Sequence, residues 1–434
     1  MKNKHFSLVM GTCVMLMTCC VNLQADNIKT GTERLITTNP LTQVTDCGWP
    51  SAFALDGDNV VWIDERNGSQ GQQVFGVDLT DVNLDEFLID DAGGDIYKIT
   101  LSDTMAFYPV EPYTESDDHY FLRLADITDP NAVRLYDLDP NGADGALGDL
   151  DISGSLVAYS TLNTKTWQFS LIAADITDPN HVVQHVIYGP TYNDIYTLTL
   201  DGAYLCWAGW DDTESKNVLR VADISDLTDP NIQTFVFPDD AYLSSLDSSG
   251  DWLVAQGNYP DSDTYGLFGV QYYWNVENFS IEKIWETPTR GEVDMGPPRI
   301  DHGKVVWTFS DYVPSVSGDD HYSQSKYLYL ANLLPPGPGP VSELIKTTES
   351  DPNQVYGADI SGDTIVWSYY SNDDYLTRLH SAELEMSCGD WGYLPADLNR
   401  DCLVNLLDFA KFAESWLYCT DPNKPGCLYG VFNN

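Results

Sequence analysis

A unit of about fifty residues recurs seven times between residues 33 and 385, so this region must be built from copies of one small structural unit. The best-preserved part of the unit is a turn followed by an apolar strand, which ends in an aromatic residue in most copies. The clearest copies are residues 57–62 (GDNVVW), 202–207 (GAYLCW), 303–307 (GKVVW) and 362–367 (GDTIVW). Weaker copies are residues 102–107, 154–159 and 250–255.

Each unit contains the pattern of four short strands. One strand precedes the turn, and two alternating strands follow the aromatic residue, separated in three units by the turn sequence TDPN. Frequent β-branched and aromatic residues, Gly and Asp turns, and the absence of long amphipathic helices favour an all-β fold. Four strands in each of seven units predict a seven-bladed β-propeller with four-stranded blades.

The ends of the repeat region predict how the ring closes. The seventh unit lacks its fourth strand, whereas residues 33–37 have the pattern of a fourth strand and precede the first unit. We therefore expect residues 33–37 to pair with the third strand of the last blade, which would remove the exposed edge of an open array. The proline-rich residues 335–340 fall between the third and fourth strands of the sixth unit and are interpreted as a surface loop.

The repeats resemble the seven-bladed TolB-like and WD40-like propellers of exported bacterial proteins. The resemblance covers residues 33–385 and comes from the period and patterning of the strands rather than from an active-site motif. It therefore implies a fold and no particular activity.

The N-terminus has the pattern of an export signal over residues 1–25. Lys2 and Lys4 precede an apolar run over residues 6–21, and cleavage is expected after Ala25. A lipoprotein signal that acylates Cys19 is the alternative. The apolar run is too short to span a membrane, so we expect an extracellular protein without a membrane span, with attachment to the cell surface as a further possibility.

A twelve-residue loop at residues 397–408 has the ligand spacing of an EF-hand-type calcium site, and an apolar helical pattern follows it. Side-chain oxygens occupy positions 1, 3, 5, 9 and 12, and the residue at position 7 offers its backbone carbonyl. The predicted Ca²⁺ ligands are Asp397, Asn399, Asp401, Leu403, Asn405 and Asp408. An Asp- and Asn-rich surface turn that binds no metal is the alternative.

This loop resembles that of type I dockerins, including Asp at position 12. The resemblance implies that residues 388–428 form a calcium-binding module that docks a cohesin-like protein partner. Cys402 replaces the expected Gly of position 6, and one loop is present where dockerins carry two. Both departures bear on the docking function more than on metal binding.

Cysteines cluster in the same C-terminal segment. Cys388, Cys402, Cys419 and Cys427 indicate two disulfides that stabilise a small module, with a zinc site as the less favoured alternative because no His lies among them. Cys47 and Cys206 lie near predicted strands and are interpreted as buried thiols.

The formal net charge of −45 excludes binding to a nucleic-acid backbone and disfavours anionic membranes. No nucleophile motif, zinc-binding His pair or phosphate-binding loop is present. Residues 117–120 and 319–322 repeat the sequence DDHY, which suits a metal or a sugar, although a solvated loop is the simpler interpretation. Acids on innermost strands, such as Asp149, Asp151 or Asp359, are candidates for catalysis.

Aromatic residues divide into two predicted groups. Trp62, Trp207, Trp307 and Trp367 recur at one position of one strand and are expected to pack between blades. A second group is expected in loops, where it would form a binding surface: Trp210, Tyr259, Tyr265, Tyr369 and Tyr370.

Three functions follow from these features. The favoured one is a non-catalytic secreted propeller that binds a glycan or protein and is attached through the calcium module to an extracellular assembly. The second is an extracellular glycoside hydrolase or polysaccharide lyase. The third is an envelope-assembly propeller of the TolB type.

Overall fold

The computed structural model describes residues 28–37, 44, 52–66, 71–112, 120–138, 146–236, 242–258, 265–271, 280–286, 293–314, 322–333, 341–348, 353–371, 374–385 and 406–416. Within these ranges the chain is almost entirely β-structure, and the single helix of this part of the chain is α1 (Leu406–Trp416).

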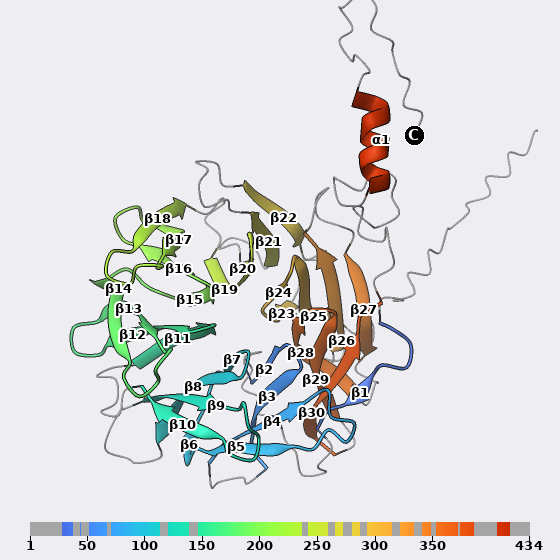
Figure 1. Cartoon of the computed structure of the whole chain (residues 1–434), viewed down its shortest axis with the longest axis horizontal. Coiled ribbons are helices and arrows are strands. Elements are labelled where there is room, and N and C mark those ends of the chain that lie inside the picture. Colours follow the sequence, from blue (N-terminus) through green and yellow to red (C-terminus); the bar gives the residue numbers. More distant parts are fainter. Residues whose placement is uncertain are drawn as a thin grey trace, which may run out of the picture.

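The strands pair into seven antiparallel sheets, which are arranged around a common centre in Figure 1. We number the sheets 1 to 7 in chain order. Sheet 1 contains β2 (Phe53–Asp56), β3 (Asn59–Asp64), β4 (Gln73–Asp78) and β5 (Phe87–Asp91); sheet 2 contains β6 (Gly94–Asp95), β7 (Thr100–Ser102), β8 (Met105–Pro112), β9 (Phe121–Asp126) and β10 (Arg134–Asp137). Sheet 3 contains β11 (Ala146–Ser153), β12 (Leu156–Asn163), β13 (Gln168–Asp175) and β14 (Val183–Thr191); sheet 4 contains β15 (Thr197–Asp201), β16 (Tyr204–Asp211), β17 (Lys216–Asp223) and β18 (Asn231–Val236).

The remaining sheets follow the same order. Sheet 5 contains β19 (Tyr242–Ser249), β20 (Trp252–Asn258), β21 (Tyr265–Gln271) and β22 (Ser280–Glu286); sheet 6 contains β23 (Val293–Met295), β24 (Arg299–Asp301), β25 (Lys304–Pro314), β26 (Tyr322–Asn332) and β27 (Ser342–Thr348). Sheet 7 contains β28 (Asn353–Ser361), β29 (Thr364–Ser371), β30 (Leu376–Glu383) and the N-terminal strand β1 (Arg34–Leu35). The arrangement is an all-β propeller.

The hydrophobic core lies between neighbouring sheets. The four tryptophans that were expected to pack there are fully buried: Trp62, Trp207, Trp307 and Trp367. Trp207 of sheet 4 lies in one cluster with Ala158 and Ile187 of sheet 3, and Trp367 of sheet 7 lies in another with Val306 of sheet 6. The repeated aromatic position therefore fills the space between adjacent sheets, and burial of its large ring is a main stabilising contribution of the repeats that carry a tryptophan there.

The N-terminal segment completes sheet 7, as residues 33–37 were predicted to do. β1 pairs antiparallel with β30, with Arg34 opposite Ser381 and Leu35 opposite His380. The contact extends beyond the strand, because the Ile36 N–H donates to the Leu379 carbonyl at 2.9 Å. Figure 1 shows β1, in blue, beside β30 near the other end of the colour scale. Sheet 7 thus joins segments from both ends of the repeat region.

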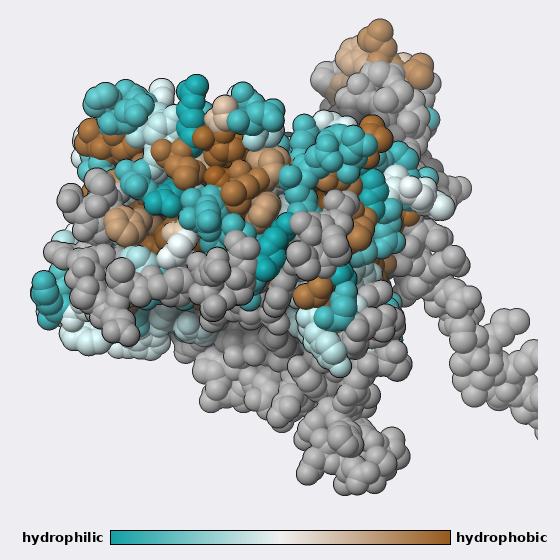
Figure 2. Space-filling model, turned by 90° about the horizontal axis from the view of Figure 1, so that it is seen from below, coloured by the Kyte–Doolittle hydropathy of each residue, from teal (hydrophilic) through white to brown (hydrophobic). Residues whose placement is uncertain are grey.

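Several sequence predictions fall outside the described residues: the signal at residues 1–25, the proline-rich residues 335–340, Cys47 and the C-terminal cysteines. Residues 335–340 connect β26 to β27, which are adjacent strands of sheet 6. Cys206 in β16 is buried, as expected. None of the helical residues that the structure describes forms a stretch long and apolar enough to cross a membrane. Hydrophilic and hydrophobic residues are interspersed on the side of the molecule shown in Figure 2.

The contact between the N-terminal segment and sheet 7 predicts different effects for two neighbouring substitutions. Ile36 is fully buried in a cluster with Val60 of sheet 1 and Leu379 of sheet 7, whereas Leu35 is 41% exposed. Ile36→Ala should lower the free energy of unfolding by about 2–5 kcal/mol. Leu35→Ala is the control and should lower it by less than about 1 kcal/mol. Equal effects in urea unfolding would show that the segment is not packed across both sheets.

Candidate functional site

The innermost strand of every sheet, which we call its first strand, contributes to one cavity of about 260 Å³, the axial cavity. In sheets 2 and 6 this strand is β7 and β24. The lining of the cavity comes from β2, β7, β11, β15, β19, β24 and β28. Polar side chains dominate this lining, and the charged ones are Asp56, Lys98, Asp151, Asp201, Asp247, Arg299, Asp301 and Asp359. Because all seven sheets contribute to this cavity, it is the leading candidate for a binding or catalytic site.

A cyclic set of seven hydrogen bonds, which we call the turn ring, lies where the first strands end. The last residue of each first strand is Asp or Ser, and its side chain accepts the N–H of the turn residue in the next sheet. The donor–acceptor distances are 2.5 to 3.0 Å. The acceptors in chain order are Asp56, Ser102, Ser153, Asp201, Ser249, Asp301 and Ser361, and the last of these binds the turn of sheet 1.

The donors of the turn ring share a left-handed backbone. Their φ angles lie between 47° and 61°, and five of the seven are glycine. A Cβ atom added to Gly57, Gly154 or Gly202 would meet nothing within 4 Å, so the backbone angle rather than lack of space favours glycine there. Asp103 and His302 occupy the other two positions.

A second layer of inter-sheet bonds lies two residues before the turn ring. Asp151, Asp247 and Asp359, which we call the axial acids, each accept a backbone N–H from the next sheet. The donors are Leu200 at 2.8 Å, Ile300 at 2.7 Å and Leu55 at 2.8 Å. These bonds tie sheet 3 to sheet 4, sheet 5 to sheet 6, and sheet 7 to sheet 1.

Burial in the cavity changes the acidity of the axial acids. It raises the pKa of Asp247 to about 7 and that of Asp359 to about 6, although the Arg299 guanidinium opposes both shifts. Burial also raises the pKa of Asp151, with Lys98 opposing. The cost of placing carboxylates in a poorly hydrated space outweighs the attraction of the nearby cations.

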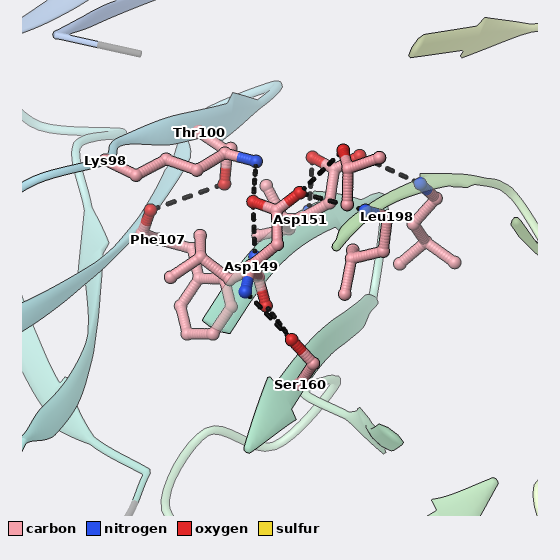
Figure 3. A network of polar contacts seen from close by, with 11 residues as sticks. Lys98, Thr100, Phe107, Asp149, Asp151, Ser160 and Leu198 are labelled. Atoms are coloured by element: carbon pink, nitrogen blue, oxygen red, sulfur yellow. Dashed lines mark hydrogen bonds and ion pairs between the residues drawn. The ribbon is translucent and has the colours of Figure 1, made fainter. Parts of the chain in front are cut away.

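Asp149 is held by contacts from three sheets (Figure 3). Its Oδ1 pairs with the Lys98 Nζ at 2.5 Å, and its Oδ2 accepts the Leu198 N–H at 2.9 Å and the Thr197 hydroxyl at 3.0 Å. Its own N–H donates to Ser160 Oγ at 2.8 Å. Asp149 therefore joins sheets 2, 3 and 4 and is saturated by these partners.

The structure thus brings together the acids that were named from the sequence, Asp149, Asp151 and Asp359, but each of them is bound to a neighbouring sheet. Sequence reasoning missed Asp247, which has the most clearly raised pKa. Its signal was available, because it occupies the same repeat position as Asp151 and Asp359, two residues before the turn. In the part of the chain that the structure describes, no three His, Cys, Asp or Glu side chains are grouped to hold a metal ion.

The predicted loop aromatics are placed differently from the expectation. Trp210 lies in β16, and Tyr369 and Tyr370 lie in β29, all half-buried, while Tyr265 begins β21. The loop assignment is wrong for these four. The second strands β16 and β29 continue for several residues beyond the buried tryptophan, and Tyr265 pairs with Asn258 of β20. Tyr259 lies outside the described residues. Among the described residues of the seven sheets and their connections, the most exposed aromatics are instead Trp167, Tyr192 and Tyr375, at 67%, 62% and 70%.

Most residues of the other predicted sites lie outside the described ranges. These are residues 117–119 and 319–321 of the DDHY loops, and Asp397, Asn399, Asp401, Leu403 and Asn405 of the calcium loop. Asp408 lies in the first turn of α1 and is 3% exposed, whereas its neighbours Leu407 and Phe409 are 61% and 65% exposed. Among residues 406–412, the part of α1 whose burial is described, Asp408 alone is buried, which fits the closing ligand of such a loop.

No family model matches the chain, and no curated protein matches it. Among solved structures, an acylaminoacyl peptidase in complex with Z-Gly-Gly-Phe-chloromethyl ketone has a TM-score of 0.51 and 11% identity, over 79% of this chain and 52% of that one. The orthorhombic form of Pyrococcus horikoshii acylaminoacyl peptidase has a TM-score of 0.51 and 11% identity, over 80% and 53%. TolB from Acinetobacter baumannii has a TM-score of 0.39 and 13% identity, over 76% and 81%.

This chain spans about half the length of the acylaminoacyl peptidases that it resembles. At these identities the likeness shows the fold alone, which is an all-β propeller.

The raised pKa of Asp247 predicts a specific pH dependence of stability. The folded state holds this proton up to about pH 7, whereas an unfolded aspartate loses it near pH 3.8, so the contribution of Asp247 to stability falls as pH rises between these values. Relative to Asp247→Asn, the wild type should lose about 1.4 kcal/mol of unfolding free energy per pH unit between pH 5 and 7. Denaturant titrations at several pH values test this. If the unfolding free energies of the two proteins changed in parallel with pH, the raised pKa of Asp247 would be contradicted.

Proposed function

We propose that the protein is a secreted, non-catalytic β-propeller that binds a glycan or protein ligand. Seven blades of the TolB-like and WD40-like type would form its closed ring, and a calcium-binding dockerin-like module would attach it to an extracellular assembly for polysaccharide utilisation. Seven sheets joined by a cyclic set of hydrogen bonds support the closed ring.

The hydrogen bonds of the axial acids favour a binding role over a catalytic one. Hydrolysis by paired acids needs one carboxyl group to protonate the leaving group and a second to act as base or nucleophile. In the axial cavity Asp151, Asp247 and Asp359 each accept a backbone N–H of the next sheet. A substrate that reorganised these carboxylates would weaken the contacts between sheets, so they serve the architecture of the ring.

An extracellular glycoside hydrolase or polysaccharide lyase is the second candidate, and one observation favours it. The pKa values of about 7 for Asp247 and about 6 for Asp359 lie in the range of a general acid at neutral pH. The two acids flank Arg299, on the strand between theirs, in the same cavity. This candidate requires access of a sugar chain to that cavity.

Calcium is the cofactor of the proposed attachment module. Asp397, Asn399, Asp401, Asn405 and Asp408 would supply side-chain oxygens, and Leu403 its backbone carbonyl. Asp408 is the member within the described residues, and its burial on α1 fits this role. Calcium bound there would neutralise the loop carboxylates and order the loop against the helix.

A polysaccharide-binding and degradation screen of the full chain tests the binding role. We expect retention on at least one polysaccharide without release of reducing ends or unsaturated products. Product release that is lost in Asp247→Asn or Asp359→Asn would establish the enzyme instead. Retention on no polysaccharide and on no protein from an extracellular assembly would refute the proposed function.

Calorimetric titration of the full chain with calcium tests the attachment module. We expect a stoichiometric site that Asp408→Ala weakens by about tenfold or more, because it removes a ligand that is bidentate in such loops. Leu406→Ala in the same helix is the control, because this side chain is 82% exposed and carries no oxygen, and it should bind as the wild type does. An unchanged affinity in Asp408→Ala would remove the ligand assignment.

A further inference from the structure

Trp167 is an exposed tryptophan held in a left-handed turn. It lies between β12 and β13 with φ of 57°, and its N–H donates to the Asn163 carbonyl at 2.7 Å. Turns of the same length join the second and third strands of sheets 4 and 7. Ser215 and Tyr375 occupy the equivalent left-handed position there, with φ of 50° and 60°.

Folding does not account for a tryptophan at this position. A bulky residue with positive φ is a genuine outlier and costs roughly 1–2 kcal/mol. The ring is 67% exposed, so burial returns little of this cost. Ser215 shows that the same turn forms with a small side chain. Neither the turn nor burial therefore requires a tryptophan at this position, and its exposed ring is available for a contact at the surface.

Further aromatic rings lie at the same end of the sheets. Phe169 pairs with Thr191, so Trp167, just before β13, and Tyr192, just after β14, lie at the same end of adjacent strands of sheet 3. Tyr192 is 62% exposed. The ring centroids of Tyr196, just before β15 of sheet 4, and Tyr242, the first residue of β19 in sheet 5, are 4.6 Å apart. These four residues form what we call the aromatic patch.

Polar groups accompany the aromatic patch. The Tyr196 hydroxyl donates to Asp194 Oδ2 at 3.3 Å, and the Asp212 N–H donates to the Asn193 side-chain oxygen at 3.1 Å. Carboxylate and amide oxygens beside exposed rings suit a ligand with both hydroxyl groups and C–H faces. The patch lies at the opposite end of the sheets from the turn ring, because turns after first strands and turns after second strands alternate in an antiparallel sheet.

We propose that the aromatic patch on sheets 3 to 5 binds a neutral polysaccharide chain. Pyranose rings would stack their C–H faces on Trp167 and Tyr192, while sugar hydroxyls donate to Asp194. This inference rests on the proposed binding function and names its site and ligand class.

The negative charge of the protein favours a neutral polysaccharide over an acidic one. The chain carries 66 acidic and 21 basic residues, and Asp194 and Asp212 lie in the patch itself. A polyuronate or sulfated chain would therefore be repelled on approach and in the bound state. A neutral chain meets no such penalty, and its binding should change little with salt because no ion pairs form.

Affinity electrophoresis of the full chain on neutral β-glucan, xylan and mannan, with polygalacturonate as the acidic comparison, tests this site. Trp167→Ala and Tyr192→Ala should each weaken binding to the retained neutral polysaccharide by roughly tenfold, the usual order for loss of one aromatic contact. Trp167→Gly keeps the left-handed turn without strain and should show the same loss with an unfolding temperature no lower than that of the wild type.

Tyr375→Ala is the matched control, because it removes an aromatic ring of similar exposure from the same turn of sheet 7. It should bind as the wild type does. If Trp167→Gly and Tyr192→Ala both bound the polysaccharide with wild-type affinity, the aromatic patch would not be the binding site, and the proposed function would stand. Binding to polygalacturonate alone would overturn the ligand class. A wild type that binds no polysaccharide would overturn the inference together with its premise.

Discussion

A polar side chain at the end of each first strand binds the turn of the next sheet, and the rest of the propeller depends on this contact. In a tight turn the N–H of the first central residue has no partner within the turn. Each of the seven turn residues finds that partner in an Asp or Ser of the preceding sheet. Because the seventh bond returns to sheet 1, every sheet is both donor and acceptor.

The axial acids also accept backbone N–H groups of the next sheet, but burial of their carboxylates makes these contacts energetically more costly. A carboxylate accepts a strand N–H more strongly than a neutral oxygen does, but three of them in one small cavity are poorly hydrated. Arg299 lies on the strand between those of Asp247 and Asp359 and opposes the rise of their pKa values. The acids that resemble catalytic candidates in sequence are therefore explained first by the contacts between sheets, and the raised pKa values follow from the same burial.

Aromatic residues show how position within the repeat separates structural from surface roles. Trp207 and Trp367 occupy the middle of second strands, where the neighbouring sheet covers them. Trp167 lies only a few residues beyond the end of such a strand, in a turn that no sheet covers, and is 67% exposed. Tryptophan is thus a core residue in the strands and a surface residue in the turn, where Trp167 also differs by its left-handed backbone.

The sequence by itself determined the repeat, the four strands found in five of the seven sheets, the burial of the tryptophans and the pairing of residues 33–37 with the last sheet. These follow from local patterns, since strand alternation and turn residues are set by neighbours in the chain. Only the tertiary structure decided which groups the axial acids bind, how burial raises their pKa values, and that Trp167 rather than Tyr369 or Tyr370 is exposed. Their surroundings come from sheets about fifty residues away in sequence, and no local pattern records whether such a partner is a backbone N–H, a cation or solvent.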